Sequence, residues 1–208
     1  MFWQMKRALK ALVRGIALVF AAPAAVTELL CRYLLGHDVW FSTHAQFFSL
    51  VPGKIGSYFR VAYYRMTLRH CADDCYIGFG TLITHSEAQL GSRVYIGTRC
   101  IIGTATVNAD VMLADHVQVL SGKYQHGTDL SNGAFQRQPQ KFTHINIGSN
   151  CWIGANAVIM ANIGEQAIVG AGSVVTRAVE PCTVVAGVPA RVIRTAATQD
   201  LVLSRRKT

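Results

Sequence analysis

The residues best suited to chemistry gather in one segment, between about residues 122 and 144. Among its residues are Lys123, Tyr124, His126, Asp129, Arg137 and Lys141. A histidine titrates near neutral pH, so the neutral ring of His126 could accept a proton from a hydroxyl group. Such chemistry requires a rigid framework on either side of the segment, and the flanking sequence indicates what that framework is.

On both sides of this segment an aliphatic residue returns about every six positions, usually with a glycine behind it. The pairs are Ile77-Gly78, Leu90-Gly91, Ile96-Gly97, Ile102-Gly103, Ile147-Gly148, Ile153-Gly154, Ile163-Gly164 and Val169-Gly170. The same phase continues at Ile83, Val107, Leu113, Val119, Ile159 and Val175. A period of six fits neither an α-helix nor a simply alternating strand. It predicts short strands that close triangular coils, with the aliphatic residue inside and the glycine taking positive φ at a corner.

The inward residues can be assigned in turn to three sides. Side one holds Ile77, Ile96, Leu113, Ile153 and Val169; side two holds Ile83, Ile102, Val119, Ile159 and Val175; side three holds Leu90, Val107, Ile147 and Ile163. The count is consistent only if residues from about 122 to 144 form one excursion between sides two and three. A long loop on a rigid scaffold is usually functional. His85 follows Ile83 by two positions, so we expect it on the same edge, about 10 Å or two strand spacings from the loop.

The position two before each aliphatic residue also points inward and is small. It is occupied by Cys75, Thr81, Cys100, Val111, Val117, Cys151, Ala157, Ala167 and Ser173. Three of the six cysteines fall in this set, so we expect them to pack in the core. Cys71 and Cys75 lie beside His70, but no second ligand pair follows at zinc spacing, and we expect no metal there. No disulfide framework is indicated, which fits a reducing compartment.

At 208 residues the chain can form one sizeable domain with an appendage. Its net charge is +9, and residues 1–70 carry most of it, with nine Lys/Arg against two Asp/Glu. The repeat region is nearly neutral, which argues against nucleic-acid binding there. We therefore divide the chain into an apolar, basic N-terminal helical region (1–70), a repeat domain (71–194) and a basic C-terminal tail (195–208).

The N-terminal region is strongly apolar over residues 8–35, yet its longest uncharged run, Gly15 to Thr27, falls short of the ~20 residues that span a bilayer. Pro23 should break or kink a helix, and Pro52-Gly53 should separate two helices. We expect these helices to lie on the inner face of a membrane with their basic residues outermost. Packing on the solenoid end or on a neighbouring subunit is an alternative, and a cleaved signal peptide is another.

Four stretches of the repeat region form a specific combination of motifs. They are Ser121-Gly122-Lys123-Tyr124-Gln125-His126, Ile147-Gly148-Ser149-Asn150-Cys151-Trp152-Ile153-Gly154, Val169-Gly170-Ala171-Gly172-Ser173-Val174-Val175-Thr176-Arg177 and Ala186-Gly187-Val188-Pro189-Ala190-Arg191-Val192-Ile193-Arg194. Together they resemble the hexapeptide-repeat acyltransferases, most closely the galactoside, maltose and xenobiotic acetyltransferases and the exopolysaccharide O-acetyltransferases. The resemblance covers about residues 75–194. It implies a left-handed parallel β-helix, an exception to the right-handed crossover rule, and a homotrimer with active sites between subunits.

The same resemblance implies acetyl-CoA as donor and a loop histidine as catalytic base, whose place His126 occupies. Matching residue by residue assigns coenzyme A contacts to Ala155, Ala171, Thr176, Arg177, Arg191 and Arg194. Candidate substrate contacts are His85, Lys123, Tyr124, Asp129 and Trp152, and Asp110, Asp115 and Asp129 are candidates to orient His126. The chain departs from the family between Ile159 and Ile163, where Met160-Ala161-Asn162 replaces a longer corner with a Pro-Gly pair. No residue matches the family's sugar-binding positions.

These features predict an acetyl-CoA-dependent O-acetyltransferase that acts directly on a sugar hydroxyl, in a polysaccharide or a lipid-linked precursor. We expect it in the cytoplasm or peripherally on the inner membrane face. Three alternatives stay open: N-acetylation of an amino sugar, a non-catalytic scaffold, and a zinc carbonic anhydrase that would use His85, His116 and His126. That last family places two zinc ligands five residues apart, and no two histidines here have this spacing.

Overall fold

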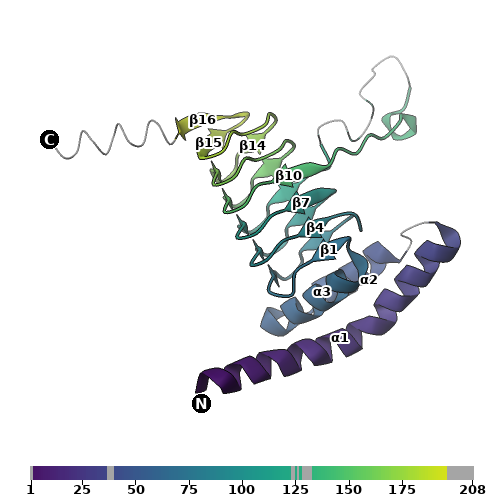
Figure 1. The fold of residues 1–208 in the computed structure, drawn as a ribbon. Helices are drawn as coiled ribbons and strands as arrows, with labels where there is room; N and C mark the ends of the chain where they lie inside the picture. Colours follow the sequence, from purple (N-terminus) through teal and green to yellow (C-terminus); the bar gives the residue numbers. More distant parts are fainter. Residues whose placement is uncertain (1, 37–39, 123–124, 126, 128–132, 196–208) are drawn as a thin grey trace.

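The computed structural model describes residues 2–36, 40–122, 125, 127 and 133–195, which form a triangular solenoid with helices at its N-terminal end (Figure 1). Sheet A contains β1 (His70–Cys71), β4 (Gln89–Leu90), β7 (Ala105–Val107) and β10 (Ile145–Ile147). Sheet B contains β2 (Tyr76–Ile77), β5 (Tyr95–Ile96), β8 (Met112–Leu113), β11 (Trp152–Ile153), β13 (Ile168–Val169), β15 (Thr183–Gly187) and β16 (Ala190–Thr195). Sheet C contains β3 (Leu82–Ile83), β6 (Ile101–Ile102), β9 (Gln118–Val119), β12 (Val158–Ile159) and β14 (Val174–Val175).

These sheets are the three predicted sides, so the parallel β-helix with an N-terminal helical segment is confirmed. Neighbouring strands within each sheet are parallel, except that β16 returns antiparallel to β15. Each inward aliphatic residue stacks on its counterpart one coil away, as Ile77 does on Ile96 and Ile96 on Leu113. All three are fully buried. The stack therefore forms one continuous core along the solenoid.

The small inward positions also pack in the core. Cys100 and Cys151 are buried, and Cys75 is half-buried. Burial raises the pKa of the Cys100 thiol to about 11, and it raises the pKa of Cys151 as well. A raised pKa keeps both thiols neutral, as expected of small apolar core residues.

The glycines behind the inward aliphatic residues serve a different purpose from the one predicted. Positive φ falls instead on the residue before the small inward position, as at Arg99, where φ is 53°. The glycines are needed because the next coil passes very close. A Cβ on Gly148 would lie 2.5 Å from the backbone nitrogen of Glu165, and one on Gly154 would lie 2.5 Å from that of Ala171. Close backbone stacking, and not a corner conformation, therefore selects glycine.

Three helices, rather than two, precede the solenoid: α1 (Phe2–Leu35), α2 (Phe41–Ser49) and α3 (Gly53–Thr67). Pro52 forms the N-cap of α3, so the predicted boundary at Pro52-Gly53 is confirmed. Pro23 does not break α1, although the helix curves along its length (Figure 1). Within the part of the chain that the structure describes, residues 8–35 of α1 are the one stretch long and apolar enough to cross a membrane, by length and composition alone.

The inner face of α1 carries small residues and charges. Ala17, Ala21 and Ala25 are buried, and α1 packs along α3. Glu28 is fully buried and accepts hydrogen bonds from Arg32, at 2.9 Å for the closer nitrogen. The expectation that the basic residues lie outermost is therefore wrong for Arg32, because burying Glu28 requires a cation beside it.

Helix α3 closes the open end of the first coil. The Ser57 hydroxyl accepts a hydrogen bond of 3.0 Å from the Ile77 amide, and the Tyr64 hydroxyl accepts one of 3.0 Å from the Ile83 amide. These amides would otherwise be buried donors without a partner. Side chains of α3 thus replace the preceding coil that a solenoid end lacks.

Arg60 of α3 ties this cap together. Its side chain is fully buried; Nε donates to the Ile77 carbonyl at 3.0 Å, and Nη1 donates to the carbonyls of Val51 at 2.7 Å and Phe48 at 3.1 Å. The last two carbonyls lie at the C-terminal end of α2, where the helix dipole favours a cation. One guanidinium therefore joins α2, α3 and the first coil.

The long excursion leaves the solenoid after β9 and rejoins it at β10, as predicted. The amide of Thr143 donates to the Ser121 carbonyl at 2.8 Å, which closes the base of the loop. Nearby, the rings of His85 and Phe142 lie 4.9 Å apart, centroid to centroid. The expectation that His85 lies on the edge of the loop is confirmed by this contact.

Replacing Ile102 by Ala should lower the free energy of unfolding by about 2–5 kcal/mol, because it opens a cavity in the stacked core. Ile101 is the matched control, since it is the same residue in the same strand but is 40% exposed on the outer face. Ile101→Ala should cost less than about 1 kcal/mol. Urea unfolding followed by circular dichroism measures both, and equal losses would contradict the assigned inward face.

Replacing Phe142 by Ala should loosen the loop without weakening the solenoid. The lost ring contact with His85 is worth about 0.5–1.5 kcal/mol, so limited trypsin cleavage at Arg137 and Lys141 should become about 3- to 10-fold faster. Phe135→Ala is the control, because Phe135 is 53% exposed and Phe142 is 47% exposed. Equal acceleration in both variants would show that the His85 contact does not hold the loop.

Candidate active site at the loop edge of the solenoid

One edge of the prism differs from the other two. Between sheets A and B, and between sheets B and C, successive inward residues are six positions apart in every coil. Between sheets C and A the spacing varies from coil to coil. It is seven from Ile83 to Leu90, five from Ile102 to Val107, twenty-eight from Val119 to Ile147, and four both from Ile159 to Ile163 and from Val175 to Val179. We name this the loop edge. Irregular corners create recesses on an otherwise regular surface, and cavities are found here.

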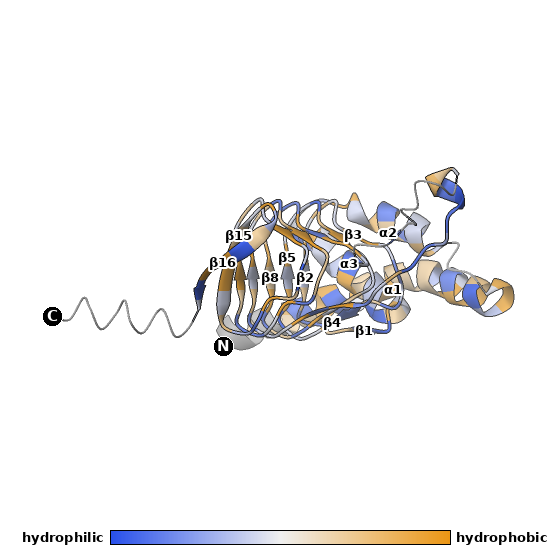
Figure 2. Cartoon of the chain, turned by 90° about the horizontal axis from the view of Figure 1, so that it is seen from above, coloured by the Kyte–Doolittle hydropathy of each residue, from blue (hydrophilic) through white to orange (hydrophobic). Residues whose placement is uncertain are grey.

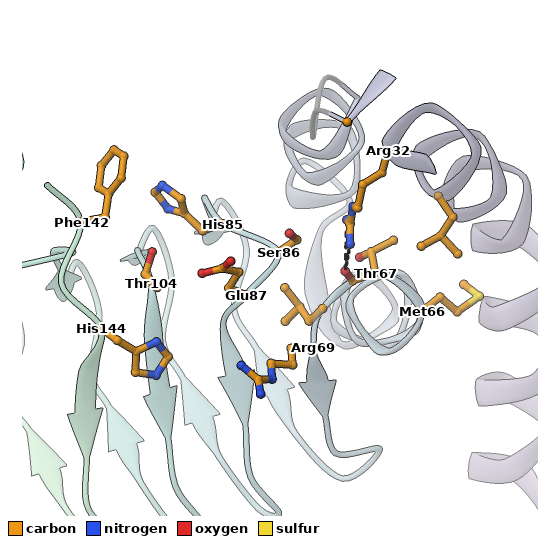
Figure 3. A pocket seen from close by; sticks show the side chains of 13 residues that line it. Arg32, Met66, Thr67, Arg69, His85, Ser86, Glu87, Thr104, Phe142 and His144 are labelled. Atoms are coloured by element: carbon orange, nitrogen blue, oxygen red, sulfur yellow. Dashed lines mark hydrogen bonds between the residues drawn. The ribbon is translucent and has the colours of Figure 1, made fainter. Parts of the chain in front are cut away.

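The largest of them, the cap-side cavity, has a volume of about 950 Å³ and lies between the helices and the loop (Figure 3). Helix α1 contributes Leu29 and Arg32, and Arg69 follows α3. The solenoid corners contribute His85, Ser86, Glu87 and Thr104, and the end of the loop contributes Phe142 and His144. Cations, a carboxylate, hydroxyl groups and an aromatic ring thus converge on one recess, a lining suited to a small polar ligand.

Each of its two histidines is held through one ring nitrogen. Nδ1 of His85 lies 2.9 Å from the Thr84 hydroxyl, and Nε2 of His144 lies 2.7 Å from the Thr106 hydroxyl. Such a contact fixes the ring orientation and, with it, the direction in which the second ring nitrogen points. His85 and His144 are therefore oriented groups at the cavity wall.

A second recess, the tip-side cavity, has a volume of about 500 Å³ and lies on the other side of the loop base. Its lining includes Thr143 and His144 from the loop, the corner Met160-Ala161-Asn162, and Thr176 and Arg177. The shortened corner that departs from the family pattern is thus part of this cavity wall. Its Asn162 side chain accepts a hydrogen bond of 2.9 Å from the Asn146 amide. His144 lines both cavities, so they adjoin at the base of the loop.

Arg177 connects the tip-side cavity to a smaller one of about 220 Å³, which Arg191 of β16 also lines. Both guanidinium groups are exposed. Thr176, Arg177 and Arg191, three of the predicted coenzyme contacts, therefore lie along one continuous stretch of surface. Arg194 lies in the same strand as Arg191, with its Cα paired to that of Val184.

The other predicted site residues lie elsewhere or outside the described residues. Lys123, Tyr124, His126 and Asp129 belong to the latter group. Ala155 and Ala171 stack on the edge between sheets B and C, where the Gly172 amide donates to the Ala155 carbonyl at 2.8 Å. Trp152 is 53% exposed on the outer face of sheet B, the side opposite the loop edge. A single chain does not bring Ala155, Ala171 or Trp152 to His85.

Two of the three carboxylates expected to orient His126 also lie away from the loop edge. Asp110 pairs with Arg93, whose Nε is 2.6 Å away, and this contact lowers the pKa of the carboxyl group. Asp115 accepts a hydrogen bond of 2.6 Å from the Thr98 amide, which lowers its pKa too. His116 follows Asp115, so it and His85 lie on different edges. Among the described residues, no group of three or more His, Cys, Asp or Glu side chains could hold a metal ion.

Several loop-edge residues were missed by the sequence analysis, chiefly Arg69, Glu87, Thr104, Phe142 and His144. His144 was detectable, because it stands directly before Ile145, where the excursion rejoins the solenoid. Its position mirrors that of His85, which follows an inward residue on the same edge. Arg69 was not detectable, since its place in the cavity depends on how α3 packs against the first coil.

Residues 144–177 match the family model described as the hexapeptide repeat of succinyl-transferase. The chain is 38% identical over 115 residues to the galactoside O-acetyltransferase of Escherichia coli, covering 52% of this chain and 54% of that protein. It is 27% identical over 124 residues to a putative lipopolysaccharide biosynthesis O-acetyl transferase of the same species, covering 56% and 62%. The chain thus spans little more than half the length of these relatives.

Among solved structures, a galactoside acetyltransferase in complex with coenzyme A superposes with a TM-score of 0.65 at 21% identity, covering 77% of this chain and 82% of that one. This likeness concerns the fold, and it confirms the left-handed parallel β-helix that the family resemblance implied. The repeat region is therefore similar to hexapeptide-repeat acyltransferases, in sequence to these relatives and in fold to this structure.

Proposed function

We propose that this protein transfers an acetyl group from acetyl-CoA to a hydroxyl group of a sugar. The observation that carries the proposal is that two cavities of different character meet at His144, at the base of the loop. The tip-side cavity contains the matched coenzyme residues Thr176 and Arg177. The cap-side cavity contains the oriented ring of His85 and the carboxylate of Glu87. A donor on one side and an acceptor on the other would react where the loop divides them.

The relatives support this assignment of substrates. The named O-acetyltransferases act, by their names, in galactoside acetylation and in lipopolysaccharide biosynthesis, and a structure of the same fold holds coenzyme A. Exposed arginines suit the donor, because a guanidinium binds phosphate oxygens through paired hydrogen bonds. Arg177 and Arg191 on one stretch of surface, with Arg194 beside them, are therefore proposed to hold the phosphates of the coenzyme.

The reaction requires one proton transfer. In the proposed mechanism, the neutral ring of His126 removes the hydroxyl proton as the sugar oxygen attacks the thioester carbonyl. The new C–O bond forms, the C–S bond breaks, and the proton passes from His126 to the leaving thiolate. No acyl-enzyme intermediate is needed. The role of His126 rests on the family resemblance, since this residue lies outside those that the structure describes.

We also propose that the complete site forms between copies of this chain. The outer face of sheet B is unusually apolar, with Tyr95 at 42%, Met112 at 50% and Trp152 at 53% exposure. A second copy packed against this face would bury it, as large exposed apolar surfaces usually require. It would also bring Trp152 of one copy toward the loop edge of another. This arrangement is the trimer that the resemblance implies.

Acetyl-CoA should bind to the purified protein, and Arg177→Gln and Arg191→Gln should each weaken binding by about 10- to 100-fold. That range corresponds to the ~1.5–3 kcal/mol of a hydrogen bond to a charged group. Arg65→Gln is the control, because Arg65 is exposed on α3, at the far end of the solenoid, and should leave affinity unchanged. Isothermal titration calorimetry measures all four proteins. Absence of binding would remove the coenzyme half of the proposal.

His126→Ala should reduce kcat by about 10²- to 10⁴-fold, the usual contribution of a general base, without changing the affinity for acetyl-CoA. Thiol release is measured with galactosides and maltose as acceptors. His116→Asn is the control, since His116 has a φ of 59°, which Asn tolerates, and lies on another edge. Full activity in His126→Ala would show that another group, such as His144, removes the proton.

A further inference from the structure

Helix α1 turns three charged residues, Arg14, Glu28 and Arg32, toward the protein and most of its large apolar side chains outward, the reverse of an ordinary surface helix. Arg14 lies 2.8 Å from Asp73 of the first coil, and Glu28 is buried beneath Arg32. Arg32 also donates to the Thr67 carbonyl of α3 at 3.3 Å. The polar side of α1 therefore packs against α3 and the first coil.

The outer surface of α1 and α2 is broadly apolar. Its large apolar side chains with at least 45% exposure are Met5, Leu9, Leu12, Ile16, Val19, Phe20, Val26, Leu30, Tyr33, Leu34 and Leu35 of α1, together with Trp40, Phe47 and Leu50 at α2. We name these residues the outer apolar surface. Helix α1 lies at the end of the molecule away from β16 (Figure 1), and orange, hydrophobic segments alternate along it with pale and blue ones (Figure 2). A soluble protein rarely exposes so large a contiguous apolar patch without a partner.

A groove between α1 and α2 adds to this surface. It has a volume of about 470 Å³, and its lining is almost entirely apolar: Phe20, Pro23, Ala24, His44, Phe47, Phe48, Val51 and Phe59. Burial lowers the pKa of His44, so this ring is neutral near neutral pH. Phe20 and Phe47 at its rim are 68% and 67% exposed, so the groove is open to an apolar chain.

The charge of this region distinguishes a lipid surface from a second protein copy. Glu28 is the only acidic residue of α1, and it is buried. Lys10 and Lys54 are exposed, and residues 1–70 carry nine basic and two acidic residues. Two copies joined through this face would bring like charges together. An anionic bilayer would instead attract the basic residues while its acyl chains take up the apolar side chains.

The contacts of the inner face argue for a helix that lies in the plane of the membrane. A helix crossing the bilayer would have to leave α3 and place Arg14, Glu28 and Arg32 in hydrocarbon. Arg14 would also lose Asp73 as its partner, and charges in hydrocarbon cost several kcal/mol each. In the plane, these residues keep the partners that they have, and only the outer apolar surface meets lipid.

We propose that the outer apolar surface binds the interfacial layer of an anionic lipid bilayer. The solenoid then stands away from the membrane, with its capped end on the surface. Leu29 and Arg32 of α1 also line the cap-side cavity. If the proposed acetyl transfer holds, this cavity lies at headgroup level and takes a sugar carried on a lipid.

The test is flotation of the full-length protein with vesicles of phosphatidylcholine, alone or with roughly 30% phosphatidylglycerol. The protein should float with the anionic vesicles, and Val19→Glu/Leu30→Glu should reduce the bound fraction at least tenfold. Lys10→Glu/Lys54→Glu should also weaken binding, by about fivefold or more for each charge. Ile101→Glu is the control, since this side chain is exposed and apolar but belongs to sheet C of the solenoid, away from the proposed subunit contact on sheet B.

Failure of the unaltered protein to float, or equal flotation of Val19→Glu/Leu30→Glu, would overturn the proposal. Should the glutamates disturb α1, as circular dichroism would reveal, Val19→Ser/Leu30→Ser replaces them with the same expected direction. A lipid-free assembly that Val19→Glu/Leu30→Glu dissociates, with no flotation, would assign the surface to a second copy instead. Acetyl-CoA affinity of the same variants should not change, so loss of coenzyme binding would count against the proposed function and not against membrane docking.

Discussion

Each inward residue of this protein must sit directly on its counterpart in the next coil, and the other features follow from that constraint. At positions such as Gly148 and Gly154, in-register stacking brings the backbone of the next coil so close that the residue behind the aliphatic position can have no side chain. In-register stacking also limits where the number of residues in a coil can change. Ile163 still stacks on Ile147 although the corner before it is short. The chain therefore changes length only where a corner can absorb the change, and it does so at a single edge.

The candidate site lies at the loop edge because the corners of irregular length are found there. A regular six-residue corner leaves no room for a cavity, whereas corners of four, five and seven residues leave recesses beside a loop of more than twenty. The rigid sheets on either side hold His85, His144 and Arg177 in fixed relative positions. Because sheet B faces away from this edge, residues such as Trp152 can join it only from another copy. Catalytic geometry and assembly are therefore coupled in the proposal.

Much of the fold could be predicted from the sequence, because one period carries it. The sides of the prism, the inward cysteines and the excursion before Ile147 all follow from counting aliphatic residues. The reason for Gly148 did not follow, since the distance to the next coil is not visible in a local pattern. Nor did the orientation of α1: its charges are few, and only the position of Asp73 and α3 decides that Arg14 and Arg32 turn inward. For the site, the unequal spacing along one edge was already present in the sequence and would have located His144. The surroundings of Arg69 depend on the packing of the helical cap.

The cap built around Arg60 has a consequence for the length of the molecule. A β-helix coil offers unpaired amides and carbonyls at its exposed end, and nothing in the repeat itself forbids another coil from being added by a separate molecule. Ser57 and Tyr64 occupy the amides at the first coil, Arg60 occupies a carbonyl there, and β16 reverses direction at the last. The repeat region is thus a finite segment cut from a structure that could in principle continue as a fibre. Displacing Arg60 would expose the backbone groups of the first coil. Another molecule could then add to that end, and the protein would polymerise end to end.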